Sequence, residues 1–81
     1  MASNSNVNVI IDGQQFDTDH LFTVIPERYR NEFEGHSFKS MKEFSKAVMF
    51  ARCAQEARYY NTPWKVTENE NTLRNILEYG W

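Results

Sequence analysis

The amino-acid sequence predicts a small α+β domain. A stretch of alternating residues near the N-terminus ends in an Asp-Gly dipeptide, which is typical of a β-hairpin. A longer stretch in the middle of the chain has apolar residues at helical spacing, which is typical of an amphipathic helix. The 81 residues, 41% hydrophobic and 15% aromatic, suit a single packed core. We therefore expect a disordered N-terminus at residues 1–6 and a single domain at residues 7–81.

The predicted hairpin consists of strands at Val7–Ile11 and Gln14–Phe16. Asp12-Gly13 lies between them and tolerates the positive φ angles of a tight two-residue turn. The side-chain oxygens of Asp17, Thr18 and Asp19 follow the hairpin. They can cap a turn or short helix that begins at His20, Leu21 and Phe22.

A short helix is predicted after Pro26. The proline disfavours helix at Ile25 and presets the φ angle of a first helical residue. Residues 28–34 can then continue for about two turns, until Gly35 supplies a left-handed end.

The central helix has the clearest signals. Ser40 and Glu43 form a predicted capping box, in which the Ser40 hydroxyl accepts from the Glu43 N–H and the Glu43 carboxylate accepts from the Ser40 N–H. Asn61 and Pro63 are expected to end the helix. The first expected apolar stripe comprises Phe44, Ala47, Val48, Ala51 and Ala54. The second comprises Phe50, Cys53, Ala57 and Tyr60.

The C-terminal part predicts a third strand and a closing helix. Trp64–Val66 has the composition of a short strand, and Thr67 with Glu70 forms a second predicted capping box. The buried face of the closing helix is expected to contain Leu73, Ile76 and Leu77, with Gly80 ending it and Trp81 folding back on Ile76. The hairpin and third strand would thus pack on the long central helix, with a short helix before it and a C-terminal helix after it.

Charge and cysteine content narrow the functional classes. A formal net charge of −2 and a pI near 5.6 provide no general attraction to nucleic acid or to an anionic membrane. A single cysteine, Cys53, excludes an intrachain disulfide and a cysteine-based zinc site. No apolar run approaches the roughly 20 residues that span a bilayer, and the first residues lack a secretion signal. We therefore expect a complete cytoplasmic protein without a membrane partner.

The sequence contains no recognisable catalytic set, and we expect neither catalytic nor metal-binding residues, nor a cofactor. Asp17, Asp19 and His20 could ligate a divalent cation, but a capping cluster is the simpler interpretation. Cys53 could act as a nucleophile only beside a base that lowers its pKa. Its place in an apolar stripe favours a buried, inert thiol. We therefore expect that the protein is not an enzyme.

Two candidate binding surfaces remain. A basic ridge on the central helix would contain Lys39, Lys42, Lys46 and Arg52, which could contact the phosphates of a nucleic acid. The simpler interpretation is a solvated helix face with Arg52 and Glu56 paired. Large exposed side chains could instead form a partner-binding surface of Tyr59, Tyr60, Trp64, Trp81 and Met49. For the four aromatic residues, burial in the core is the favoured alternative.

Three segments resemble the lead-in half of the HNH-class DNase domains of colicins and S-type pyocins. They are Ile25-Pro26-Glu27-Arg28, Ser37-Phe38-Lys39-Ser40, and residues 43–48, so the resemblance covers residues 25–48. The chain departs from that family at Ser45, where an arginine is usual, and at Met49, where a tryptophan is usual. It also lacks a counterpart of the HNH metal site. The resemblance implies a DNA-binding lineage.

Three functional hypotheses follow. The first, which we favour, is a small non-catalytic protein-interaction module that inhibits or modulates a larger cytosolic partner and is encoded by a phage or mobile element. The second is a DNA-binding module that uses the basic ridge. The third is a nuclease remnant that needs another chain to complete its active site. The sequence does not specify the partner or the oligomeric state.

Overall fold

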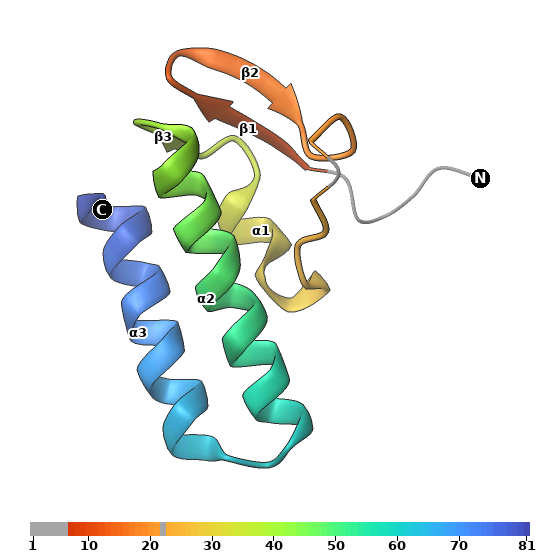
Figure 1. The fold of residues 1–81 in the computed structure, drawn as a ribbon, viewed down its shortest axis with the longest axis vertical. Helices are drawn as coiled ribbons and strands as arrows, with labels where there is room; N and C mark the ends of the chain where they lie inside the picture. The colour runs from red at the N-terminus through yellow and green to blue at the C-terminus, as the bar shows by residue number, and fades with distance from the viewer. Residues whose placement is uncertain (1–6, 22) are drawn as a thin grey trace.

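The computed structural model describes residues 7–21 and 23–81 and has an α+β architecture (Figure 1). The expected disordered segment at residues 1–6 lies outside the described residues, as does Phe22 of the predicted turn. A three-stranded mixed sheet, with strand order β2-β1-β3, packs on one side against the helices. The elements in chain order are β1 (Asn8–Ile11), β2 (Gln14–Asp17), η1 (Glu27–Tyr29), α1 (Arg30–Phe33), β3 (Ser37–Phe38), α2 (Met41–Tyr59) and α3 (Pro63–Tyr79).

The N-terminal hairpin is confirmed. Strands β1 and β2 pair antiparallel, and Asp12 and Gly13 have φ angles of 52° and 81°. These are the left-handed values that a tight hairpin turn requires. Val9 and Ile11 of β1 are buried on the helix-facing side of the sheet. The β1–β2 pair therefore provides the apolar floor on which the helices pack.

The third strand exists, but its predicted position was wrong. Strand β3 (Ser37–Phe38) pairs parallel with β1, with Phe38 opposite Ile11. The segment predicted as a strand, Trp64–Val66, instead forms part of the first turns of α3. Its helical conformation follows from Pro63, because proline suits the first helical position, where its missing N–H costs no hydrogen bond.

The second capping box was also wrong, because Thr67 and Glu70 lie inside α3. The Thr67 hydroxyl donates to the Pro63 carbonyl, and the Glu70 carboxylate contacts other parts of the chain. Helix α3 begins earlier, after Thr62, whose side chain makes no capping hydrogen bond. The short helix before β3 is confirmed, as η1 followed by α1, with Gly35 at φ 72° behind it.

Helix α2 begins and ends as predicted. The Ser40 Oγ accepts from the Glu43 N–H at 3.2 Å, and Asn61 has a left-handed φ of 59° just beyond the last turn. The reciprocal half of the capping box differs, because the Glu43 carboxylate accepts from the N–H of Lys39 rather than of Ser40. Helices α2 and α3 then run side by side in opposite directions (Figure 1).

The two predicted stripes of α2 have different outcomes. The first stripe is entirely buried, and three phenylalanine rings of the core meet at its start, with Phe38 and Phe44 5.3 Å apart between centroids. In the second stripe Ala57 is buried and Phe50 partly so, but Cys53 and Tyr60 are exposed. Helix α3 packs beside α2, and Cys53 and Tyr60 lie on the part of α2 that it leaves exposed. None of the described helices is long and apolar enough to cross a membrane.

Candidate interaction surface on helix α2

The side of α2 opposite its buried alanines is exposed along its whole length. We call this side the α2 outer face; it comprises Lys42, Ser45, Lys46, Met49, Arg52, Cys53, Glu56 and Tyr60. All of these side chains are exposed except that of Lys46, which is partly buried. The face arises because the sheet, η1, α1 and α3 cover only part of the circumference of the helix.

A shallow groove runs along one side of this face, between α2 and the segment that precedes η1. Its two halves share Arg52 and Glu56, so they form one continuous surface. We call it the α2 groove; its main lining residues are Thr23, Val24, Pro26, Ser45, Met49, Arg52, Cys53, Gln55, Glu56, Tyr59 and Tyr60. The groove thus combines a helix side with a loop fixed by Pro26.

Apolar side chains are concentrated at this groove. Val24, Met49, Tyr59 and Tyr60 are 56%, 43%, 80% and 66% exposed, and all four line it. The rings of Tyr59 and Tyr60 meet edge to face, with centroids 5.0 Å apart. Large apolar side chains that gather at one exposed site are typical of a protein-binding surface.

The structure separates the four aromatic residues that the sequence grouped. Tyr59 and Tyr60 end α2, and Trp64 lies in the first turn of α3, close to them along the chain. Trp81 lies at the opposite end of the helical pair, beside the start of α2. All four are exposed, so the favoured interpretation of these residues as core was wrong.

Trp81 does not contribute to the α2 groove. Its backbone N–H donates to the Glu43 carboxylate at 2.8 Å, and the Lys46 ammonium lies 5.0 Å from the centroid of its ring. This is the distance of a cation–π contact. The Gly80 N–H donates to the Ile76 carbonyl at the C-cap of α3. The packing of Trp81 on Ile76 stays a prediction.

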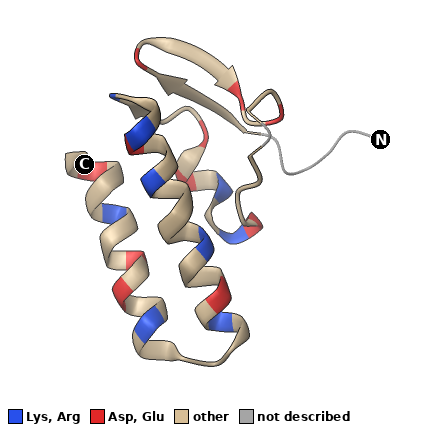
Figure 2. Cartoon of the chain, viewed as in Figure 1, with Lys and Arg blue, Asp and Glu red and all other residues tan. Residues whose placement is uncertain are grey.

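The predicted basic ridge is divided into two parts. Lys39, Lys42 and Lys46 lie around the start of α2, whereas Arg52 lies further along the helix and lines the α2 groove. Figure 2 shows that basic positions are spread along α2. Among the described residues, Arg52 and Glu56 form no ion pair of the kind that the sequence predicted. Both charges are therefore available at the groove.

Two carboxylates fix the helices that carry this surface. Glu43 is only 5% exposed, and its two oxygens accept from the backbone N–H groups of Lys39 and Trp81, both at 2.8 Å. Burial acts to raise the pKa of the Glu43 carboxyl, but these two backbone donors outweigh it, so its pKa lies below the usual value. The carboxylate thereby joins the start of α2 to the residue after α3.

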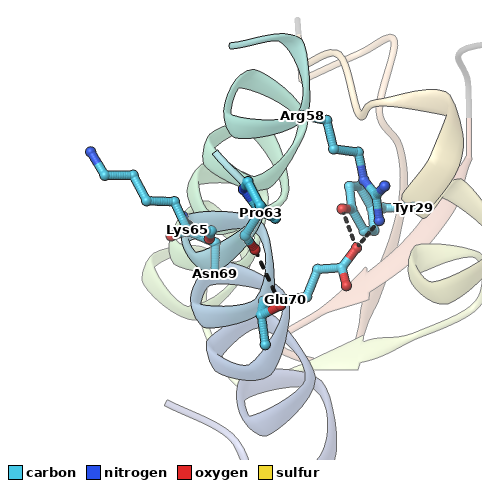
Figure 3. A network of polar contacts seen from close by, with 7 residues as sticks. Tyr29, Arg58, Pro63, Lys65, Asn69 and Glu70 are labelled. Atoms are coloured by element: carbon cyan, nitrogen blue, oxygen red, sulfur yellow. Dashed lines mark hydrogen bonds and ion pairs between the residues drawn. The ribbon is translucent and has the colours of Figure 1, made fainter. Parts of the chain in front are cut away.

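Glu70 makes the corresponding contact further along the helical pair (Figure 3). Its carboxylate accepts from the buried Tyr29 hydroxyl at 2.6 Å and from the Arg58 guanidinium at 2.8 Å. The Tyr29 hydrogen bond, followed by the Arg58 contacts, lowers the pKa of Glu70. Burial, followed by the hydrogen bond to Glu70, raises the pKa of Tyr29. The triad joins η1, α2 and α3 and has the features of a structural network.

The remaining chemical candidates do not converge. In the part of the chain that the structure describes, no group of three His, Cys, Asp or Glu residues could hold a metal ion. Asp17 accepts from the Asp19 N–H at 2.9 Å, as the capping interpretation predicts. Cys53 is exposed and lines the α2 groove, so the prediction of a buried thiol was wrong.

Sequence reasoning named Met49, Tyr59, Tyr60 and Arg52 but missed the opposite wall of the groove. Val24 belongs to that wall and is exposed beside the fully buried Ile25. The sequence signal that could have indicated Val24 was the apolar run before Pro26. A loop fixed by proline can bury one of two adjacent apolar residues and expose the other.

Comparison with protein-family models, with curated protein sequences and with solved structures gives no match to this chain. The resemblance of residues 25–48 to bacteriocin DNase domains stays a sequence-based prediction.

Proposed function

We propose that this chain is a small interaction module that inhibits or modulates a larger protein in the cytoplasm by binding it at the α2 groove, without catalysis. The observation that carries the proposal is the gathering of Val24, Met49, Tyr59 and Tyr60 around one groove, with Arg52 in it. Tyrosine, methionine and arginine are enriched at protein interfaces.

The groove has the physical features that favour protein recognition. Two tyrosines provide large contact area at a low cost in side-chain entropy, and Met49 can adapt its shape to a partner. Arg52 and Glu56 offer one charge of each sign, which can orient a partner without attracting polyanions in general. By analogy of size and composition, the proposed source of such a module is a phage or mobile element.

The lysines at the start of α2 favour DNA binding as a second candidate. Lys39 and Lys42 are exposed there, and the bacteriocin resemblance includes this part of the chain. Binding through these residues should weaken steeply between about 50 and 200 mM salt because counterions are released from DNA. Binding through the α2 groove should change little over the same range.

The test is affinity capture from a native cytosol, with and without nuclease treatment, followed by mass spectrometry. The groove variant Val24→Ser with Tyr59→Ser should lose the partner. Tyr79→Ser should retain it, because Tyr79 is equally exposed but ends α3, at the other end of the helical pair. Capture that survives the groove variant would contradict the proposal.

Two further outcomes would favour the other hypotheses. Nuclease-sensitive capture that Lys39→Glu with Lys42→Glu abolishes would favour DNA binding. Cleavage of plasmid DNA with a divalent metal, once the captured material is added to the purified chain, would favour the nuclease remnant.

A further inference from the structure

We infer that the α2 groove receives an amphipathic helix of the larger partner, in which one acidic and one basic side chain lie a turn apart between two apolar anchors. The inference deepens the proposed function and rests on it, since it states the chemistry of the segment that the groove binds. Two observations carry it: the order of side chains along the groove, and the backbone groups that its walls have already used.

Two opposite charges lie in the middle of the groove. Arg52 and Glu56 are both exposed, and both line the part that the two halves share. They are one turn apart on α2, a spacing at which unlike charges commonly pair. Among the described residues, however, the ion pair is between Arg58 and Glu70. A partner that brings a carboxylate to Arg52 and a cation to Glu56 compensates both groups for the water that docking removes.

Apolar side chains lie on either side of these charges. In the first half of the groove, the exposed Met49 lies with the buried Phe44 and Val48. In the second half, Tyr59 of α2 and Val24 of the loop wall are both exposed. The order along the groove is therefore apolar, charged, apolar. Its complement is a segment with an apolar anchor on each side of an acid–base pair.

The groove has the length of a helix of several turns. Its lining residues on the exposed side of α2 extend from Ser45 to Tyr60, which corresponds to about 22 Å of helix. Arg52 and Glu56 are separated by about 6 Å along the same axis. A helix that lies along α2 presents the side chains of one face at the same interval, so one of its turns spans the two charges.

The backbone of the groove walls favours a helix over an extended segment. The backbone groups along α2 are paired within that helix. In the loop wall, the Thr23 N–H donates to the Thr18 carbonyl, and the Pro26 carbonyl accepts from the Tyr29 N–H. Pro26 itself has no N–H. An extended segment would find few backbone partners in these walls, whereas a helix satisfies its own N–H and C=O groups.

The test is binding of the purified chain to synthetic helical peptides, measured by fluorescence anisotropy. Each peptide carries on one face, at intervals of one turn, a leucine, two charged residues and a second leucine. Two peptides are used, one with lysine before glutamate and one with glutamate before lysine, because the groove specifies the spacing and not the direction of the helix. One of them should bind saturably, and circular dichroism should show helix gained on binding.

Charge reversal identifies the contacts of that peptide. Arg52→Glu and Glu56→Arg should each weaken its binding about tenfold, because each change places like charges together. When the chain carries both changes and both peptide charges are reversed, binding should return to within about threefold of wild type. Arg74→Glu is a matched control, because Arg74 is exposed on α3 and outside the groove, and binding should be unchanged. Circular dichroism should show all variants folded.

Three results would overturn the inference. They are binding of neither peptide, equally tight binding of a peptide with a central proline, which cannot form the helix, and reversed charges that fail to restore binding. Each would leave the proposed function intact if Val24→Ser with Tyr59→Ser still loses the larger partner. Conversely, peptide binding at the groove by a chain whose capture of that partner survives Val24→Ser with Tyr59→Ser would overturn the proposed function alone.

Discussion

The inner and outer faces of α2 differ in what their residues do. On the inner face Ala47, Ala51 and Ala54 are completely buried, and such small side chains allow the neighbouring elements to approach closely. On the outer face Met49 and Cys53 have no such neighbours and remain exposed. We therefore expect stability to depend mainly on the inner face, whereas the outer face is the one that the proposed recognition would use.

The largest effect is expected on the inner face. Phe44→Ala removes a buried ring that packs against Phe33 and Phe38 and leaves a cavity in a small core. We expect it to lower the free energy of unfolding by about 3–5 kcal/mol, measured by urea denaturation followed by circular dichroism. A loss below about 1 kcal/mol would show that the inner face does not dominate stability.

Glu43→Gln should have the next largest effect. The amide supplies one acceptor where the carboxylate supplies two, and its NH₂ group would face a backbone N–H. We expect a loss of about 1.5–3 kcal/mol in the free energy of unfolding. Ser40→Ala, which removes only the helix cap, is a matched comparison and should cost about 1 kcal/mol. Equal losses in the two variants would argue against the contact with Trp81.

Tyr29→Phe should cost about 1–2 kcal/mol, because Glu70 loses its shortest hydrogen bond but keeps Arg58. The double variant Tyr29→Phe with Glu70→Gln should lose less than the sum of the single losses, since both changes remove the same contact. Strict additivity in thermal unfolding would show that the contact contributes nothing to stability.

Acid should destabilise the protein through both carboxylates. The pKa values of Glu43 and Glu70 are lower in the folded state than the usual value of 4.5. The unfolded chain therefore binds protons first as pH falls, so their contribution is present above about pH 4.5 and is lost as pH falls through the folded-state pKa values. Glu43→Gln should flatten the dependence of stability on pH in this range. An unchanged slope would contradict the role of Glu43.

The smallest effect on stability is expected on the outer face. Met49→Ala should change the free energy of unfolding by no more than about 0.5 kcal/mol, because the side chain is exposed. It should nevertheless weaken capture of the larger partner in the affinity experiment. A large loss of stability would mean that Met49 belongs to the core, and the contrast between the two faces would fail.

Features with local causes could be predicted from the sequence. Asp12-Gly13 specified the hairpin, Ser40 the start of α2, and Asn61 its end, because each acts through the conformation or hydrogen bonds of adjacent backbone. Errors arose where contacts with a segment distant in the sequence determined the local structure. The prediction for Trp64–Val66 used composition, whereas Pro63 and packing against α2 made it helical. Tyr29 and Glu70 are far apart in the sequence, and no local pattern joins them.

The candidate site shows the same division. Met49 and Arg52 could be placed on the outer face of α2 because helical periodicity fixes which positions share a side. The exposure of Tyr59, Tyr60 and Cys53 depended on where α3 and η1 stop covering α2, which periodicity does not specify. The groove wall that contains Val24 could not be predicted, because its position depends on the path of the loop before η1.

The two carboxylate contacts have a consequence for folding. Tyr29 and Glu70 are 41 residues apart, and Glu43 and Trp81 are 38 apart, so each hydrogen bond closes a long stretch of chain. Neither can form before α3 docks on α2. Docking of α3 should therefore order η1 and the C-terminal residue together. We expect cooperative unfolding, in which hydrogen exchange accelerates in η1, α2 and α3 at once.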